Sequence, residues 1–131
     1  MKIFIAILSL IILPMVLFGC ASHEKKLIES KAKYYDQASL EKLFSKKHSA
    51  SFVTDKGVKG MIYYYPNRTM HVEFNGKNDN GEYFFKAGQL CSTWKTIRKG
   101  EKCYRLYEVS SNVFEVVRDN GLYDSTITFL E

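Results

Sequence analysis

The chain has 131 residues, a formal net charge of +5, 46% hydrophobic residues and 15% aromatic residues. This length fits one domain with a single modest core. The excess positive charge lies in residues 21–47, which hold seven lysines and four acidic residues, while residues 48–131 are nearly balanced. A nucleic-acid-binding domain would carry a basic stripe on its folded part, so the charge distribution excludes that class of function.

The first element is an apolar stretch over residues 3–18, preceded by Lys2. It is shorter than the roughly 20 apolar residues of a membrane-spanning helix and has the length of a signal-peptide core. We therefore expect a targeting segment at 1–19. A true transmembrane anchor and an ordinary cleaved signal are the alternatives to a lipoprotein signal.

The end of this stretch, Leu17-Phe18-Gly19-Cys20, resembles a bacterial lipobox. The resemblance implies a diacylglyceryl group on the Cys20 sulfur, cleavage before Cys20 and acylation of the new amino terminus. Several acyl chains give a stable anchor, so we expect a lipoprotein that is attached to a membrane without spanning it. The residue directly after Cys20 is alanine and not aspartate, which favours the outer membrane, facing the periplasm, if the host is Gram-negative.

Two short segments precede the strands. Residues 20–36 are charged and contain few apolar side chains, which predicts a lipid-anchored tether or a frayed helix. Further on, Leu40, Leu43 and Phe44 have the i, i+3, i+4 spacing of one helical stripe. This spacing predicts one short N-terminal helix, capped by Ser39, that must pack on the rest of a domain spanning 37–131.

From residue 50 onward, β-branched and aromatic runs alternate with turn sequences, including a polar loop expected at 75–81. Such short connections join antiparallel neighbours and leave no room for a crossover helix. We therefore predict a mainly β fold: an antiparallel meander of about 7–8 strands, as a curved sheet or a small lipocalin-like barrel. The expected strands are 50–54, 60–65, 70–75, 82–86, 90–96, 102–109, 113–118 and 125–130.

Two cysteines besides the lipidation residue lie in neighbouring predicted strands. Side-chain alternation places Cys91 and Cys103 on one face, and Trp94 and Tyr104 on the other. A compartment outside the cytoplasm favours a disulfide over a redox pair or a zinc site. The register stays open, because a tight turn at 98–100 would hold the cysteines about 13 Å apart and a bridge needs a wider loop.

Aromatic side chains occupy both faces of the predicted sheet, because neighbouring residues in a strand point in opposite directions. Core packing and an amphipathic surface account for most of them, and the others suit a ligand-binding face. The candidate ligand-binding residues are Trp94, Tyr63, Tyr65 and Tyr104.

Five short motifs together resemble a family of small exported proteobacterial proteins classed only as a domain of unknown function. The most specific of them is an L-C-x-x-W…C-Y pattern. They are Leu43-Phe44, Tyr64-Tyr65-Pro66-Asn67-Arg68-Thr69, Gly81-Glu82-Tyr83, Leu90-Cys91-Ser92-Thr93-Trp94 and Cys103-Tyr104. The resemblance implies a β-rich fold and an exported location, and it implies no activity.

Catalytic motifs for serine hydrolases, zinc proteases and nucleotide-binding proteins do not occur in the sequence. His71 and Glu73 share a strand face, and an ordinary polar surface is preferred over a metal or acid–base site. We therefore expect no catalytic residue, metal or cofactor. The leading hypothesis is a non-enzymatic envelope lipoprotein that binds a protein partner or assists assembly. The alternative is a carrier of a small apolar ligand or lipid in an aromatic-lined barrel or cleft.

Overall fold

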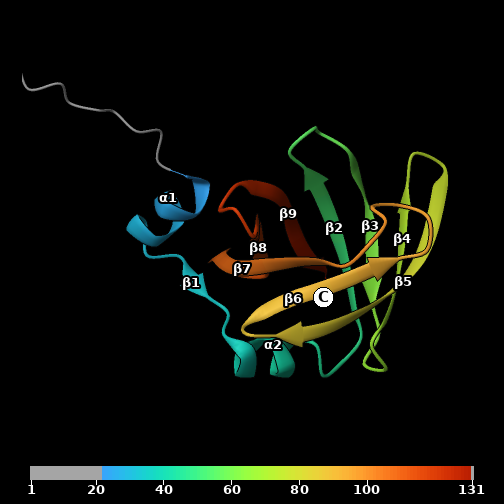
Figure 1. The fold of residues 1–131 in the computed structure, drawn as a ribbon, viewed down its shortest axis with the longest axis horizontal. Coiled ribbons are helices and arrows are strands. Elements are labelled where there is room, and N and C mark those ends of the chain that lie inside the picture. Colours follow the sequence, from blue (N-terminus) through green and yellow to red (C-terminus); the bar gives the residue numbers. More distant parts are fainter. Residues whose placement is uncertain (1–21, 131) are drawn as a thin grey trace, which may run out of the picture.

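The computed structural model of the chain describes residues 22–130. Its core is a meander of eight antiparallel strands, and the first and last strands of the meander pair with each other from Ser49↔Leu130 to Thr54↔Ser125. The meander is therefore a closed barrel, which confirms the predicted mainly β fold (Figure 1). The strands are β2 (His48–Thr54), β3 (Lys59–Tyr64), β4 (Thr69–Phe74), β5 (Lys77–Lys86), β6 (Gln89–Trp94), β7 (Lys102–Ser110), β8 (Val113–Arg118) and β9 (Tyr123–Leu130).

Tight turns join most of the strands. Asn75–Gly76 and Ala87–Gly88 have positive φ angles at both residues, as two-residue hairpin turns of the primed type require. The predicted polar loop at 75–81 is wrong, because β5 begins at Lys77. The backbone of residues 77–80 pairs with β4, and the exposed side chains of Asn78 and Asn80 remain in solvent.

A short helix, α2 (Gln37–Leu43), closes one end of the barrel (Figure 1). Leu40 is fully buried, and Phe44 packs its ring 4.9 Å from that of Tyr64. The cap is Asp36 and not the predicted Ser39: the Asp36 carboxylate accepts a hydrogen bond from the Ser39 backbone N–H at 2.9 Å. The apolar stripe of α2 therefore forms the floor of the barrel.

The described part of the predicted tether is folded. Residues 23–34 form α1 (His23–Glu29) and β1 (Lys33–Tyr34), so residues 22–130 contain two helices where the sequence predicted one short helix after a tether or frayed helix. Leu27 of α1 is buried against the outer wall with Tyr107 and Val117. β1 pairs with the second half of β7. Over residues 23–34 the structure differs from the predicted tether, because charged contacts to distant residues, rather than an apolar stripe, hold much of α1.

The predicted signal segment and Cys20 lie outside the described residues. Between residues 22 and 130, no helix has the length and apolar character needed to cross a membrane.

Candidate ligand-binding cup

The barrel contains a cavity of about 820 Å³ at the end opposite α2, here called the cup. Its rim is formed by the loops β2–β3, β6–β7 and β8–β9, which Figure 1 shows at the other end of the barrel from α2. A volume of this size falls within the range of pockets that hold small molecules, roughly 300–1,000 Å³.

The cup has a closed floor and partly uncovered walls. Near the floor, Tyr64, Met70 and Tyr83 are at most 3% exposed, and the rings of Tyr64 and Tyr83 pack against Phe44 at the end of α2. Nearer the rim, Phe52, Phe74, Trp94, Ile97 and Tyr104 line the cavity and are only partly buried. Apolar and aromatic surface is therefore available inside the barrel to a molecule that enters through the rim.

A charged group lies on one side of the cup mouth. The carboxylate of Asp124, which is 3% exposed, accepts hydrogen bonds from Arg98 at 2.9 Å, Arg118 at 3.2 Å and Ser125 at 3.0 Å. Arg98 also donates to the Tyr104 hydroxyl at 3.2 Å. The two arginines join the β6–β7 and β8–β9 loops around one buried carboxylate.

The environment of this group changes its acid–base behaviour. Burial raises the pKa of the Tyr104 phenol, and the negative charge of Asp124 raises it further. Burial alone would lower the pKa of Arg98, but the charges and hydrogen bonds of Asp124 and Tyr104 together outweigh it, and the pKa of Arg98 is raised. Tyr104 therefore stays a neutral hydrogen-bonding group, and Arg98 stays a cation, at neutral pH.

A β-bulge places Asp124 in the cup. The β8–β9 register pairs Val116 with Ser125 but Val117 with Tyr123, so Asp124 is an extra residue in β9. Strict alternation would put either Asp124 or Ser125 outside the barrel. The bulge lets both neighbours be buried beside the cup. The sequence pattern did not indicate Asp124, because a bulge is not visible in the alternation of side chains and the strand was expected to begin at residue 125.

A second buried carboxylate, Asp79 of β5, fixes the β6–β7 loop. It accepts backbone N–H bonds from Thr96 at 2.9 Å, Ile97 at 3.0 Å and Asn80 at 2.9 Å. Burial alone would raise the pKa of Asp79, but the three donors outweigh it and lower the pKa. The sequence placed Asp79 in a turn, whereas it lies in a strand and holds the loop that carries Arg98.

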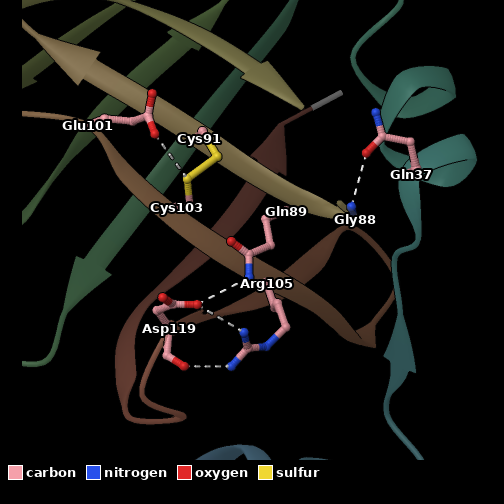
Figure 2. The surroundings of a disulfide bond; sticks show 8 residues. All are labelled: Gln37, Gly88, Gln89, Cys91, Glu101, Cys103, Arg105 and Asp119. Carbon is pink, nitrogen blue, oxygen red and sulfur yellow. Dashed lines mark hydrogen bonds and ion pairs between the residues drawn. A yellow bond between two sulfur atoms is a disulfide. The ribbon is translucent and has the colours of Figure 1, made fainter. Parts of the chain in front are cut away.

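The predicted disulfide is present between β6 and β7 (Figure 2). Cys91 and Cys103 are direct partners with Cα atoms 4.0 Å apart, so the connecting loop is the wider of the two alternatives, residues 95–101. Only three residue pairs join β6 to β7, fewer than at any other contact between neighbouring barrel strands of the described chain. The disulfide lies at the middle pair and holds the shortest contact in the barrel together.

The four candidate ligand residues separate into two groups. Trp94 and Tyr104 line the cup, and Tyr63 and Tyr65 do not. Tyr63 points outward, with its ring 6.2 Å from that of His71, and Tyr65 borders a separate depression that Trp94 also lines. The central tyrosine of the run, Tyr64, is the one that faces the cup.

His71 and Glu73 lie 3.3 Å apart, measured from Nε2 to Oε1, on the outer surface. The His71 ring also contacts the Asn80 side chain at 2.7 Å. Among residues 22–130, no group of three or more His, Cys, Asp or Glu side chains has an arrangement that could hold a metal ion.

Comparison of the chain with protein-family models, with curated proteins and with solved structures finds no match. The geometry of the cup therefore carries the functional argument, and the resemblance based on the L-C-x-x-W…C-Y pattern stays a prediction.

Proposed function

We propose that this protein is a lipid-anchored, non-enzymatic component of the cell envelope that holds one small, mainly apolar molecule in its barrel. The proposal combines the lipobox-like Cys20 with the cup. Of the two functions considered from the sequence, the cup favours the ligand carrier over the partner-binding module. The location proposed is the outer membrane, facing the periplasm.

The observation that carries this proposal is the cavity of about 820 Å³ with partly exposed aromatic walls. Burying apolar surface contributes roughly 25 cal/mol for each Å² removed from water. Phe52, Phe74 and Trp94 offer such surface on the walls of a concave site that is closed by α2 at one end and open at the rim. An apolar molecule of matching size would therefore gain affinity mainly from desolvation.

Polar groups at the mouth define the second feature of the ligand. The rim and mouth residues that line the cup balance in charge, with Lys56, Arg98, Lys102 and Arg118 against Asp55, Glu101, Asp119 and Asp124. This balance offers no net attraction to an ion. Arg98 and Tyr104 still provide hydrogen-bonding groups next to the apolar wall. A molecule with an apolar body and one polar end fits this arrangement.

The test uses Trp94, the single tryptophan of the chain, as a reporter inside the cup. The full-length protein in lipid vesicles is titrated with anilinonaphthalene sulfonate, and energy transfer from Trp94 to the bound probe is measured. Ser92→Phe places a bulky ring inside the cup and narrows it, because Ser92 lines the cavity. Thr93→Phe is the matched control, since the next residue on the same strand faces outward.

We expect Ser92→Phe to lower the energy transfer to the level that bilayer-bound probe alone gives, and Thr93→Phe to keep the value of the parent protein. Thermal melting of both variants verifies that they are folded, because overpacking costs about 1–3 kcal/mol. Equal transfer in the two variants, or no transfer in the parent protein, contradicts a ligand-binding cup. Mass spectrometry of solvent extracts from the natively purified protein and from Ser92→Phe then identifies the natural ligand.

A further inference from the structure

We propose that the mouth of the cup faces the membrane to which the protein is anchored, so that the ligand passes between the lipid and the cup. The inference rests on the proposed function, because it needs an acylated Cys20. It is carried by the position of α1, which the sequence predicted as part of a tether and which is docked beside the rim.

The described chain begins at the rim. The backbone N–H of Glu24 donates to the carbonyl of Gly121, in the β8–β9 loop, at 3.1 Å. Ser22 lies against the same glycine: a Cβ atom built on Gly121 would be 3.4 Å from the Ser22 Cβ. The Ser22 hydroxyl also caps α1 by accepting from the Lys25 N–H at 3.2 Å. Ser22 is therefore fixed next to one of the three loops that form the cup mouth.

Chain length limits where the acyl chains can enter the membrane. Cys20 precedes Ser22 by two residues, so its Cα lies within about 7 Å of the Ser22 Cα. The closed end of the barrel is farther away, since β9 runs from the rim to that end over eight residues, about 23 Å along the strand. The anchor reaches the rim and cannot reach the closed end while α1 stays docked.

Several contacts keep α1 docked. Glu24 forms a two-pronged ion pair with Arg105 of β7, with Nη2 at 2.8 Å from Oε1, and it accepts from the Tyr107 hydroxyl at 2.9 Å. Leu27 is 6% exposed, and His23 lies 2.6 Å from Glu115. Arg105 lowers the pKa of Glu24 through this hydrogen bond, so Glu24 is ionised at neutral pH. The anchor therefore leaves from a fixed point.

Surface charge alone would not select an orientation. Exposed lysines occur at the rim, such as Lys56 and Lys99, and at the closed end, such as Lys46 and Lys47. Either set would attract anionic lipid by up to about 1 kcal/mol per lysine. The position of the anchor beside the rim determines which end of the barrel faces the membrane. The exposed side chain of Leu122, next to Gly121, adds apolar surface at the rim.

The test places a single tryptophan at either end of β9, with Trp94→Phe as background. Leu122 and Leu130 are exposed to a similar degree, 49% and 47%, and lie at the rim and at the closed end. The full-length, acylated variants Leu122→Trp and Leu130→Trp are reconstituted into phosphatidylethanolamine–phosphatidylglycerol vesicles. Some of these vesicles carry bromine atoms on the acyl chains, which quench tryptophan emission on contact.

We expect Leu122→Trp to lose most of its emission in the brominated vesicles and Leu130→Trp to keep nearly all of it. Equal quenching, or stronger quenching at Leu130→Trp, would overturn the orientation. A second pair, Lys56→Trp at the rim and Lys47→Trp at the closed end, repeats the comparison in case a leucine variant does not fold.

Two other outcomes separate this inference from the proposed function. An unmodified Cys20, found by mass spectrometry of the mature amino terminus, would overturn both. A quenched Leu122→Trp in a protein whose cup binds no probe would support the orientation and contradict the ligand-binding function alone.

Discussion

Removal of the Cys91–Cys103 disulfide should lower the free energy of unfolding by an amount that follows from the length of the loop the bond closes. The bond joins residues separated by 12 positions, so it closes a loop of about 13 residues in the unfolded chain. Closing a loop of that length removes roughly 10 cal/mol/K of unfolded-state entropy, or about 3 kcal/mol at 25 °C. The double variant Cys91→Ala/Cys103→Ala should therefore lose about 3 kcal/mol of unfolding free energy.

This loss corresponds to a large shift in melting temperature. A domain of about 110 residues unfolds with an entropy of roughly 0.23 kcal/mol/K, so 3 kcal/mol lowers the melting temperature by roughly 13 °C. The assay is urea and thermal unfolding of the full-length protein in vesicles, followed by circular dichroism and Trp94 emission. Reductant added to the parent protein should reproduce the loss, and reductant added to the double variant should change nothing.

A variant that unfolds within 1 kcal/mol of the parent protein would refute the reasoning. It would mean that the three residue pairs between β6 and β7, together with the hydrogen bonds from the β6–β7 loop to Asp79, hold this part of the barrel without the covalent bond. A loss similar in size to the prediction, but absent when the parent protein is reduced, would point instead to packing around the fully buried Cys91.

Three further changes test the charged contacts. Glu24→Gln breaks the ion pair with Arg105 and should lower the free energy of unfolding by about 2 kcal/mol, between the values for exposed and buried ion pairs. Folding lowers the pKa of Glu24, so the stability that its carboxylate contributes is lost as the pH falls below about 4.5. In urea unfolding below that pH, the stability of the variant should therefore depend less on pH than that of the parent protein. Asp79→Asn should destabilise the β6–β7 loop, which faster amide hydrogen exchange at residues 96 and 97 would show. Folding lowers the pKa of Asp79, so its carboxylate stabilises the protein above the unfolded-state pKa and this stability is lost in acid. The variant should therefore lose less stability in acid than the parent protein does. Burial and the hydrogen bond to Glu24 raise the pKa of Tyr107 to about 12, so stability should fall as the pH rises from about 10 to about 12, and Tyr107→Phe should reduce that fall; a variant with an unchanged alkaline profile would contradict this assignment.

Local patterns predicted most of the barrel. All eight expected strands exist, because β-branched and aromatic runs bounded by Asn, Asp and Gly turns specify strands and hairpins locally. The face assignment of Cys91 and Cys103 also held, since side-chain alternation is a property of each strand alone. Closure was left open between a barrel and a curved sheet, because pairing of β2 with β9 depends on twist accumulated over the whole meander.

The features that the sequence did not predict depend on contacts between distant residues. Asp124 enters the cup through a bulge, and no local signal in its neighbourhood distinguishes a bulged strand from a regular one. Similarly, the charged sequence of α1 is typical of a solvent-exposed segment. The partner that holds Glu24 in place, Arg105, lies 81 positions away in the sequence. Of the candidate ligand residues, Trp94 and Tyr104 lie on the cup because their strands have regular alternation, whereas the run 63–65 offered no means of choosing the inward tyrosine.

The pairing of β2 with β9 also affects how the domain folds. These strands are about 75 residues apart in sequence, so the barrel has a high contact order and closure should be slow compared with formation of the individual hairpins. Until β9 is in place, β2 and β8 both present unpaired backbone groups to other chains. Variants that slow this last step should therefore aggregate during refolding even when the native barrel is scarcely destabilised. Yield on refolding, rather than melting temperature, is the property that the β2–β9 contact controls.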